Sequence, residues 1–252
     1  MQFDRWVDAV YLRQLQRDGQ LPSPLYSLVT CMQDPEYHPE GSVWEHTLLA
    51  LEVARNKDFD IRIKFAVLCH DLGKPIVSTV VDEKIKTYGH EEAGLEPTRY
   101  MLSLVGIVDA NSRMFIETMV LNHMIPYHLL RADAPLSAYR RFENKLNRGR
   151  VSLDDMHDLF LADQFGRRTP DAIKGESPKV HLFASKIEEY REWWSKKHQD
   201  EDPPSVVTGK HLLDMGMEQG PHIGQLLKDC RRIQLTLGWV DPQMIIDLAL
   251  KS

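Results

Sequence analysis

The chain has 252 residues, a mass of 29.1 kDa and 42% hydrophobic residues, enough for one large domain or a domain with an appendage. Its 37 acidic residues outnumber its 31 basic ones, and the net charge of −6 excludes a global positive field that recruits nucleic acid. The cysteines Cys31, Cys69 and Cys230 lie far apart and are odd in number, which excludes a disulfide framework and fits a reducing cytoplasm.

The first sixteen residues are amphipathic and mixed in charge, and they lack the apolar core of a signal peptide. No apolar run in the chain is long enough for a membrane-spanning helix. We therefore expect a cytoplasmic protein without a membrane partner.

Helical periodicity dominates the chain. Apolar residues recur at spacings of three and four in four segments, which predicts amphipathic helices over residues 43–55, 61–70, 113–123 and 152–165. Gly73 followed by Pro75 predicts a stop after the second of these helices. Ser152 and Asp155 form a variant of the capping box at the start of the fourth helix.

One stretch has β character, and the end of the chain is helical again. Residues 76–88 are rich in β-branched side chains around a polar turn, which predicts a short hairpin. A further helix is expected over 182–198, and the polar break at 199–205 predicts a domain boundary. Asp241 followed by proline predicts the start of a last helix. We thus expect one domain over 1–198 and a helical extension over 199–252 packed on it.

Histidine and aspartate side chains share the apolar faces of the predicted helices. His46, His70, His123 and Asp163 each follow apolar residues by three or four positions, so each points with the core-facing side of its helix. Asp71 is next to His70 and can reach the same space from the end of that helix. One inward histidine is more often a core residue bonded to a carbonyl, but four helices that each direct a histidine or aspartate inward indicate a shared site.

The chemistry of this site predicts a metal. Buried carboxylates need a cation, and we expect no lysine or arginine at the matching inward positions of these helices. Imidazole and carboxylate ligands without thiolate suit one or two divalent ions such as Mn, Co, Ni, Mg or Fe. We expect Cys69 to pack as a small hydrophobe beside His70 rather than to bind metal.

The order His46, His70-Asp71, Asp163 resembles the H…HD…D signature of the HD-domain metal-dependent phosphohydrolases. The phrases "HPEGSVWEHT", "HDLGKP", "YGHEEAG" and "ADQFGR" are similar to the HD region of bacterial tRNA nucleotidyltransferases, the CCA-adding enzymes. The similarity covers about residues 30–170 and continues weakly over 206–227. The nucleotidyltransferase head of those enzymes is not expected here, because only some forty residues precede the motif, and we therefore do not expect the chain to add CCA.

The resemblance implies a mostly α-helical bundle with one short β-hairpin and with the metal at its centre. It places metal ligands at His46, His70, Asp71 and Asp163, and ligands for a second ion at His90 and His123. His38 and His128 also lie near matching phrases. Their spacing does not show whether each contacts the substrate or is a surface histidine.

The expected activity is that of a metal-dependent phosphohydrolase acting through a metal-activated water on a nucleotide or a phosphorylated RNA end, as a phosphomonoesterase or a 2′,3′-cyclic phosphodiesterase. Asp71 would hold the metal, while Lys74 and Arg167 would contact the phosphate or else be solvated surface charges. Two alternatives remain: a non-catalytic nucleotide- or RNA-binding HD module, and a di-iron oxygenase with the same ligands. The basic stretch 140–150 is interpreted as a charged loop between helices.

Overall fold

A computed structural model describes residues 4–197, 205–218, 220–237 and 241–250. The chain divides into two compact units, residues 1–191 and 192–252. The predicted boundary at 198/199 lies outside the described residues, and the packing of the extension on the first unit stays a prediction. No helix in the described part of the chain has the length and apolar character needed to span a bilayer.

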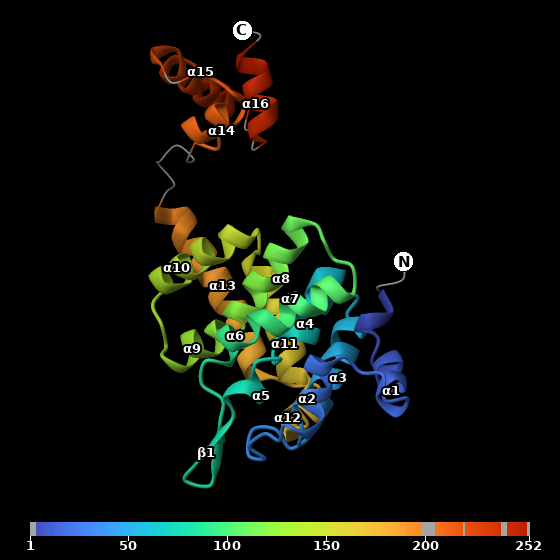
Figure 1. The fold of residues 1–252 in the computed structure, drawn as a ribbon. Helices are drawn as coiled ribbons and strands as arrows, with labels where there is room; N and C mark the ends of the chain where they lie inside the picture. The colour runs from blue at the N-terminus through green and yellow to red at the C-terminus, as the bar shows by residue number, and fades with distance from the viewer. Residues whose placement is uncertain (1–3, 198–204, 219, 238–240, 251–252) are drawn as a thin grey trace. The chain divides into compact units, whose positions relative to one another are not determined.

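The first unit is a helical bundle, and the mostly α-helical fold with one hairpin is confirmed (Figure 1). Its helices and 3-10 turns are η1 (Asp4–Val7), α1 (Ala9–Arg17), α2 (Ser23–Thr30), α3 (Val43–Asn56), α4 (Ile61–Cys69), α5 (Lys74–Val77), α6 (His90–Ala93), α7 (Leu95–Leu104), α8 (Ala110–Asn122), α9 (Ile125–Arg131), α10 (Leu136–Leu146), η2 (Asn147–Gly149), α11 (Leu153–Phe165), α12 (Pro170–Ile173) and α13 (Pro178–Lys197), whose residues up to Arg191 belong to this unit.

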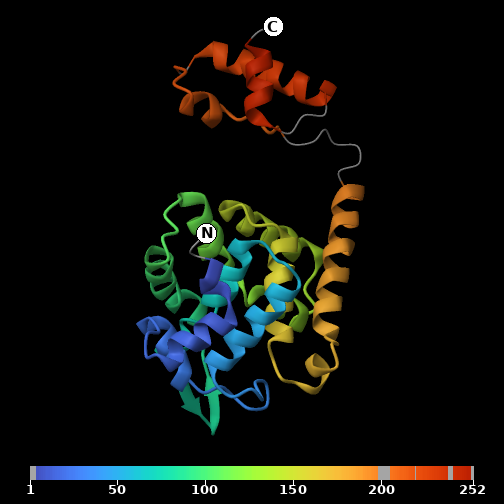
Figure 2. The same ribbon diagram turned by 90° about the vertical axis from the view of Figure 1, so that its right-hand side faces the viewer.

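The centre of this unit consists of α3, α4, α8 and α11, the four helices that periodicity predicts. Helix α3 packs against α4 and α11, and α4 packs against α8. Leu48, Phe65, Met119 and Phe160 are among their fully buried side chains. The long α13 runs along the outside of the bundle (Figure 2). Because the apolar faces of all four central helices meet, every polar residue on those faces is brought to one place.

The ends of the central helices follow from local sequence. Ser42 accepts a hydrogen bond from the Glu45 N–H at the start of α3, and Asp109 accepts one from Ser112 at the start of α8. The predicted capping box of Ser152 and Asp155 is present at the start of α11. These caps fix where each helix begins and therefore which residues reach its inner end.

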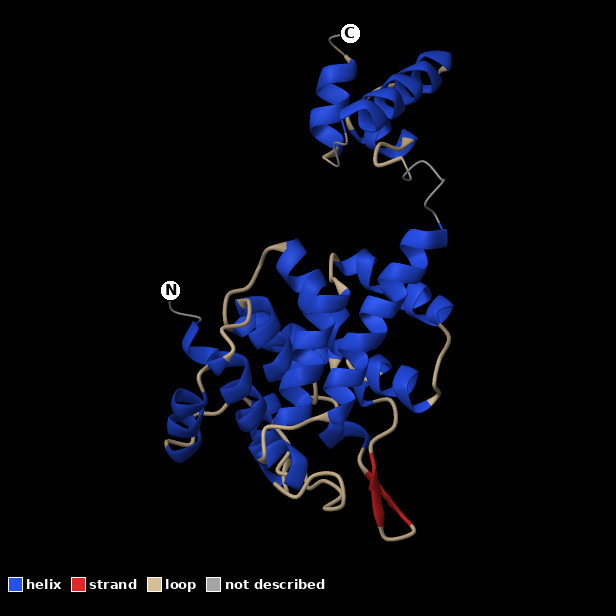
Figure 3. Cartoon of the chain, turned by 180° about the vertical axis from the view of Figure 1, so that it is seen from behind, coloured by secondary structure: helices blue, strands red, loops and turns tan. Residues whose placement is uncertain are grey.

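The hairpin consists of β1 (Thr79–Val81) and β2 (Lys84–Lys86), with Val80 opposite Ile85, and projects from the helical body (Figure 3). Both residues of its turn have positive φ, as a type I′ hairpin turn requires. The hairpin is shorter than the predicted 76–88, because Ile76 and Val77 belong to α5. Pro75 lies in the first turn of this short helix, a position where a helix tolerates proline.

The second unit has its own small core around α14 (Gly209–Asp214), α15 (Pro221–Leu237) and α16 (Pro242–Ala249). Leu212, Cys230 and Ile245 are fully buried in this core. The Asp241 carboxylate accepts a hydrogen bond from the Met244 N–H, so the predicted cap of the last helix is present.

Candidate metal centre

His46, His70 and Asp163 meet at the centre of the bundle. Their ligand atoms all lie within 4.8 Å of one another. His46 comes from the first turn of α3, His70 from the end of α4 and Asp163 from the last turn of α11. His46 Nε2 is 3.0 Å from Asp163 Oδ1. These three predicted ligands therefore form one compact group.

Asp71, His90 and His123 form a second group of the same size. The Nε2 atoms of His90 and His123 are 3.0 Å apart, and His90 Nε2 lies 3.4 Å from Asp71 Oδ1. The other oxygen of Asp71, Oδ2, faces the first group and lies 3.2 Å from His70 Nε2. Asp71 thus has one carboxylate oxygen toward each group.

The imidazoles are held with their Nε2 atoms toward this centre. The Nδ1 atoms of His70, His90 and His123 are bonded to backbone carbonyls at 2.7–2.8 Å. A carbonyl only accepts, so each Nδ1 carries a hydrogen, which leaves Nε2 as the nitrogen of each ring that can bind a metal. The same arrangement orients histidine ligands in metalloproteins.

Buried ligand atoms in this centre lack hydrogen bonds. His46 Nε2, His70 Nε2 and Asp71 Oδ2 are buried and make no hydrogen bond within the described chain. The contacts of His46 and Asp71 with charged neighbours are close in distance but do not have hydrogen-bond geometry. Nitrogen and oxygen atoms that lack hydrogen bonds and converge on one point are suitable ligands for a divalent cation.

Residues 43–167 match the HD domain family. The chain contains an HD domain. The matched segment begins at the first residue of α3 and ends just after α11, so it spans all four central helices and both ligand groups.

The chain is similar to a CCA protein and to a tRNA nucleotidyltransferase. It is 39% identical over 221 residues to the "Multifunctional CCA protein" of Halorhodospira halophila, covering 87% of this chain and 48% of that protein. It is 27% identical over 191 residues to the "A-adding tRNA nucleotidyltransferase" of Deinococcus radiodurans, covering 74% of this chain and 41% of the relative. The chain thus spans less than half the length of these two relatives. The predicted resemblance to the CCA-adding enzymes is confirmed.

The carboxylates of Asp71 and Asp163 are ionised. Burial alone would raise the pKa of Asp71, but the charges of His70 and Lys74 outweigh it and hold this pKa well below its usual range. Burial likewise acts on Asp163, where Arg167 and His46 hold the pKa well below the ordinary value. The centre therefore presents two carboxylates in the charged form that metal ions bind.

The imidazole of His123 is neutral at physiological pH. Burial, followed by the charges of His90 and His70, lowers the pKa of His123 to about 3. Metal ligation requires an unprotonated ring nitrogen, so no proton has to be displaced from this ring at pH 7.

Lys74 and Arg167 both reach the carboxylates of the centre from outside the four central helices, on whose inward positions we expected no lysine or arginine, so the carboxylates have cationic partners besides any metal. Lys74 is only 7% exposed, and its Nζ lies 2.7 Å from Asp71 Oδ2 and donates to Gln33 Oε1 at 2.7 Å. Arg167 Nη2 donates to Asp163 at 2.9 Å. Helical periodicity does not predict the contact of Lys74 because this residue lies beyond the end of α4. The turn after His70 brings Lys74 back to Asp71.

Gly73 allows the close approach that joins the two ligand groups. A Cβ added at this position would collide with the backbone of His90 and Gly94. Only glycine therefore lets the turn that carries Asp71 contact the start of α6, which carries His90. The glycine that the sequence offers as a helix stop is required here for packing.

Glu40 contacts the candidate ligand His46 and its neighbour His38, which the spacing of the sequence does not predict. Its Oε1 lies 2.8 Å from His38 Nδ1 and 2.9 Å from His46 Nδ1, and its Oε2 accepts the Arg168 N–H. Burial would raise the pKa of Glu40, but the hydrogen bonds with His38 and His46 lower it far below the ordinary value. Glu40 lies in a loop before α3, where no periodicity marks it.

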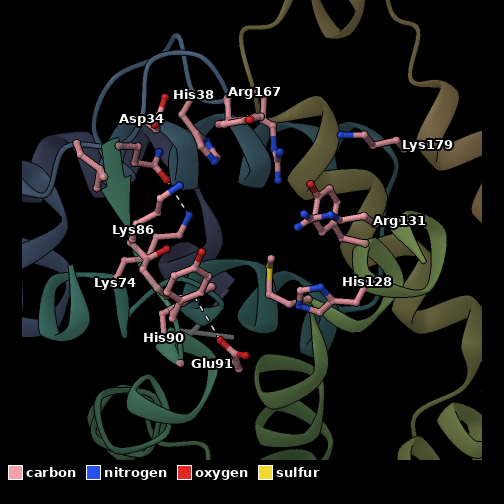
Figure 4. A pocket seen from close by; sticks show the side chains of 18 residues that line it. Asp34, His38, Lys74, Lys86, His90, Glu91, His128, Arg131, Arg167 and Lys179 are labelled. Carbon is pink, nitrogen blue, oxygen red and sulfur yellow. Dashed lines mark hydrogen bonds and ion pairs between the residues drawn. The ribbon is translucent and has the colours of Figure 1, made fainter. Parts of the chain in front are cut away.

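The two histidines left undecided by sequence differ in position. His38 is mostly buried, and burial lowers its pKa to about 4. His128 is exposed on α9 and lines a pocket of about 300 Å³ into which the centre opens (Figure 4). Lys74, His90 and Arg167 also line this pocket, whereas no residue of the 140–150 stretch does so among the described residues.

Proposed function

We propose that this HD domain is a metal-dependent phosphohydrolase acting on a nucleotide or a phosphorylated RNA end. The observation that carries the proposal is the division of the Asp71 carboxylate between two groups of ligand atoms. His46, His70 and Asp163 would hold one ion and His90 and His123 a second, with Asp71 shared between them. A shared carboxylate between two ions is typical of phosphoester-cleaving sites.

The donor set limits the ions to divalent metals that accept both imidazole and carboxylate, namely Mn, Co, Ni, Mg or Fe. Such ions supply an activated water and neutralise the negative charge that develops on a phosphoryl group. Burial raises the pKa of the fully buried Cys69 to about 12, so its thiol remains protonated and supplies no competing nucleophile.

Lys74 and Arg167 would bind the phosphate. Both line the pocket and both pair with carboxylates of the centre, Lys74 with Asp71 and Arg167 with Asp163. A metal ion at these carboxylates would weaken their attraction for the two side chains. The ammonium and guanidinium groups each have N–H donors beyond those that the carboxylates accept, and these would contact a phosphate at the mouth of the site.

The RNA-end substrate class is supported by the relatives, whose names state a tRNA nucleotidyltransferase and a CCA protein. The 2′,3′-cyclic phosphodiester and the terminal phosphomonoester both place a charged phosphate at an exposed end, which a small pocket can admit. A binding-only module would hold the same nucleotide without turning it over.

Metal analysis of the purified protein, followed by assays on phosphomonoesters and 2′,3′-cyclic nucleotides, tests the proposal. Hydrolysis should disappear with excess chelator and return with Mn, Co, Ni or Mg. In heavy-oxygen water a single turnover should label the released phosphate, or the phosphomonoester formed from a cyclic substrate. Metal-loaded protein that binds these nucleotides without cleaving them would leave only the binding module, and full activity in chelator would refute the metal mechanism.

A further inference from the structure

The pocket beside the metal centre is basic, although the chain as a whole carries a net charge of −6. Its lining includes two acidic residues, Asp34 and Glu91, against five cationic ones: Lys74, Lys86, Arg131, Arg167 and Lys179. The cationic residues come from five different segments of the chain, from α5 to α13. The fold therefore concentrates positive charge at one opening.

These cations fall on two sides of the pocket (Figure 4). Lys74 lies on the side of His90, next to the carboxylates, while Arg131 and Lys179 lie on the opposite side. Within the described chain, neither Arg131 nor Lys179 forms an ion pair with a carboxylate. Lys179 Nζ instead lies 5.1 Å from the centre of the Tyr127 ring. The far side thus offers cationic groups that no ion pair among the described residues neutralises.

Other charges of the pocket act on Lys179. Burial lowers the pKa of Lys179 and the positive charge of Arg167 lowers it further, while the carboxylate of Asp163 opposes both in part. Like charges that converge on a pocket are relieved when an anion binds between them. A single phosphate at the metal side is served by Lys74 and Arg167, which leaves the far side for a second anion.

We infer that Arg131 and Lys179 form a second phosphate subsite, so that the substrate carries another phosphate next to the one that is hydrolysed. Such a pair of phosphates occurs at the end of an RNA chain and in a nucleoside bisphosphate. The inference rests on the proposed function for the position of the first phosphate. A pocket of about 300 Å³ admits a chain end of this kind but not a duplex.

Binding measured by calorimetry in excess chelator tests the subsite without hydrolysis. The probes are a nucleoside 3′-monophosphate, a nucleoside 3′,5′-bisphosphate and a dinucleotide with a terminal 3′-phosphate. Both larger probes should bind about tenfold more tightly than the monophosphate, since a charge-assisted hydrogen bond to phosphate contributes about that factor. Equal gains for the two probes would identify the phosphate as the recognised group, and a larger gain for the dinucleotide would identify the nucleotide chain as its source.

Three variants locate the preference. Arg131→Ala and Lys179→Ala should each reduce the ratio of bisphosphate to monophosphate affinity about three- to tenfold, whereas the charge-keeping Lys179→Arg should retain most of it. Arg141→Ala is the matched control: Arg141 is also an exposed arginine, it belongs to the basic stretch 140–150 and it does not line the pocket, so the ratio should stay at the wild-type value.

The KM values of the three probes in the metal-loaded protein separate this inference from the proposed function. Hydrolysis of all three probes with equal KM values would overturn the second subsite and leave the hydrolase intact. A tighter bisphosphate complex with no hydrolysis by metal-loaded protein would refute the hydrolase and keep the subsite. Equal affinities for the three probes in chelator, or a loss of preference in Arg141→Ala, would also overturn the subsite.

Discussion

Replacing Asp71 with asparagine tests the centre at the residue that joins its two halves. Asn has nearly the same shape, but it carries no charge and replaces one carboxylate oxygen with an NH2 group. That group cannot ligate a cation, and whichever way the amide is oriented it faces one of the two histidine groups. We expect metal content to fall from about two ions per chain to none measurable, with loss of hydrolysis.

The stability of the metal-free protein should fall as well. Asp71 is 2% exposed and its partner Lys74 7%, so the variant leaves a buried ammonium without its counter-ion. Breaking a buried pair costs about 3–5 kcal/mol, and we expect about 3 kcal/mol because Lys74 keeps its hydrogen bond to Gln33. For a chain of this size that corresponds to a decrease in Tm of about 6–12 °C.

Elemental analysis and thermal unfolding in excess chelator measure these two effects separately. The double variant Asp71→Asn/Lys74→Met removes the unpaired charge, and it should recover most of the lost Tm while its metal content stays at zero. An Asp71→Asn protein that retains two ions per chain would refute the assignment of Asp71 as the shared ligand. If metal-free Asp71→Asn had the same Tm as the metal-free wild type, the predicted contribution of the Asp71–Lys74 ion pair to stability would be refuted.

Five further variants probe the surrounding residues. His90→Ala and His123→Ala should each lower metal stoichiometry from about two to about one per chain, and a wild-type stoichiometry of one in excess metal would remove the second ion. Lys74→Ala should weaken turnover without releasing metal, and metal loss in this variant would make its role structural. Glu40→Gln should weaken metal affinity about 10- to 100-fold because the carboxylate no longer orients the ligand imidazole, and unchanged affinity in a competition titration would contradict this role. The pKa of His38 is lowered to about 4, so below pH 6.5 the unfolded state takes up a proton at this residue while the folded state does not. This difference should contribute about 2 kcal/mol to the loss of stability in chelator between pH 7 and pH 5. His38→Asn should remove that contribution, as measured by urea unfolding.

The helices and their inward ligands could be predicted from sequence because both depend on local spacing. A residue three or four positions from a buried one lies on the same face of its helix, and this places His46 and Asp163 inside with no knowledge of the fold. Caps such as Ser152 are equally local. The packing of the four faces against one another then brings the ligands together.

Contacts that depend on loops and turns escaped this reasoning. Lys74 reaches Asp71 only because the turn at Gly73 reverses the chain, and that turn depends on close packing against His90. Glu40 contacts its histidines from a loop without periodicity. Nothing in the spacing of such residues predicts their neighbours, since the backbone path between them is not regular.

The basic pocket is a property of the fold rather than of any segment. The sequence draws attention to 140–150, where arginines and a lysine are close together along the chain, and yet none of these residues lines the pocket within the described part of the protein. Arg131 and Lys179 are 48 positions apart and stand in segments of ordinary charge. Because an anionic ligand responds to charges within about 10 Å of it, the spatial neighbourhood determines its binding more than the net charge of −6. An acidic chain can therefore present a phosphate-binding site, and the search for its substrate should begin among polyanions.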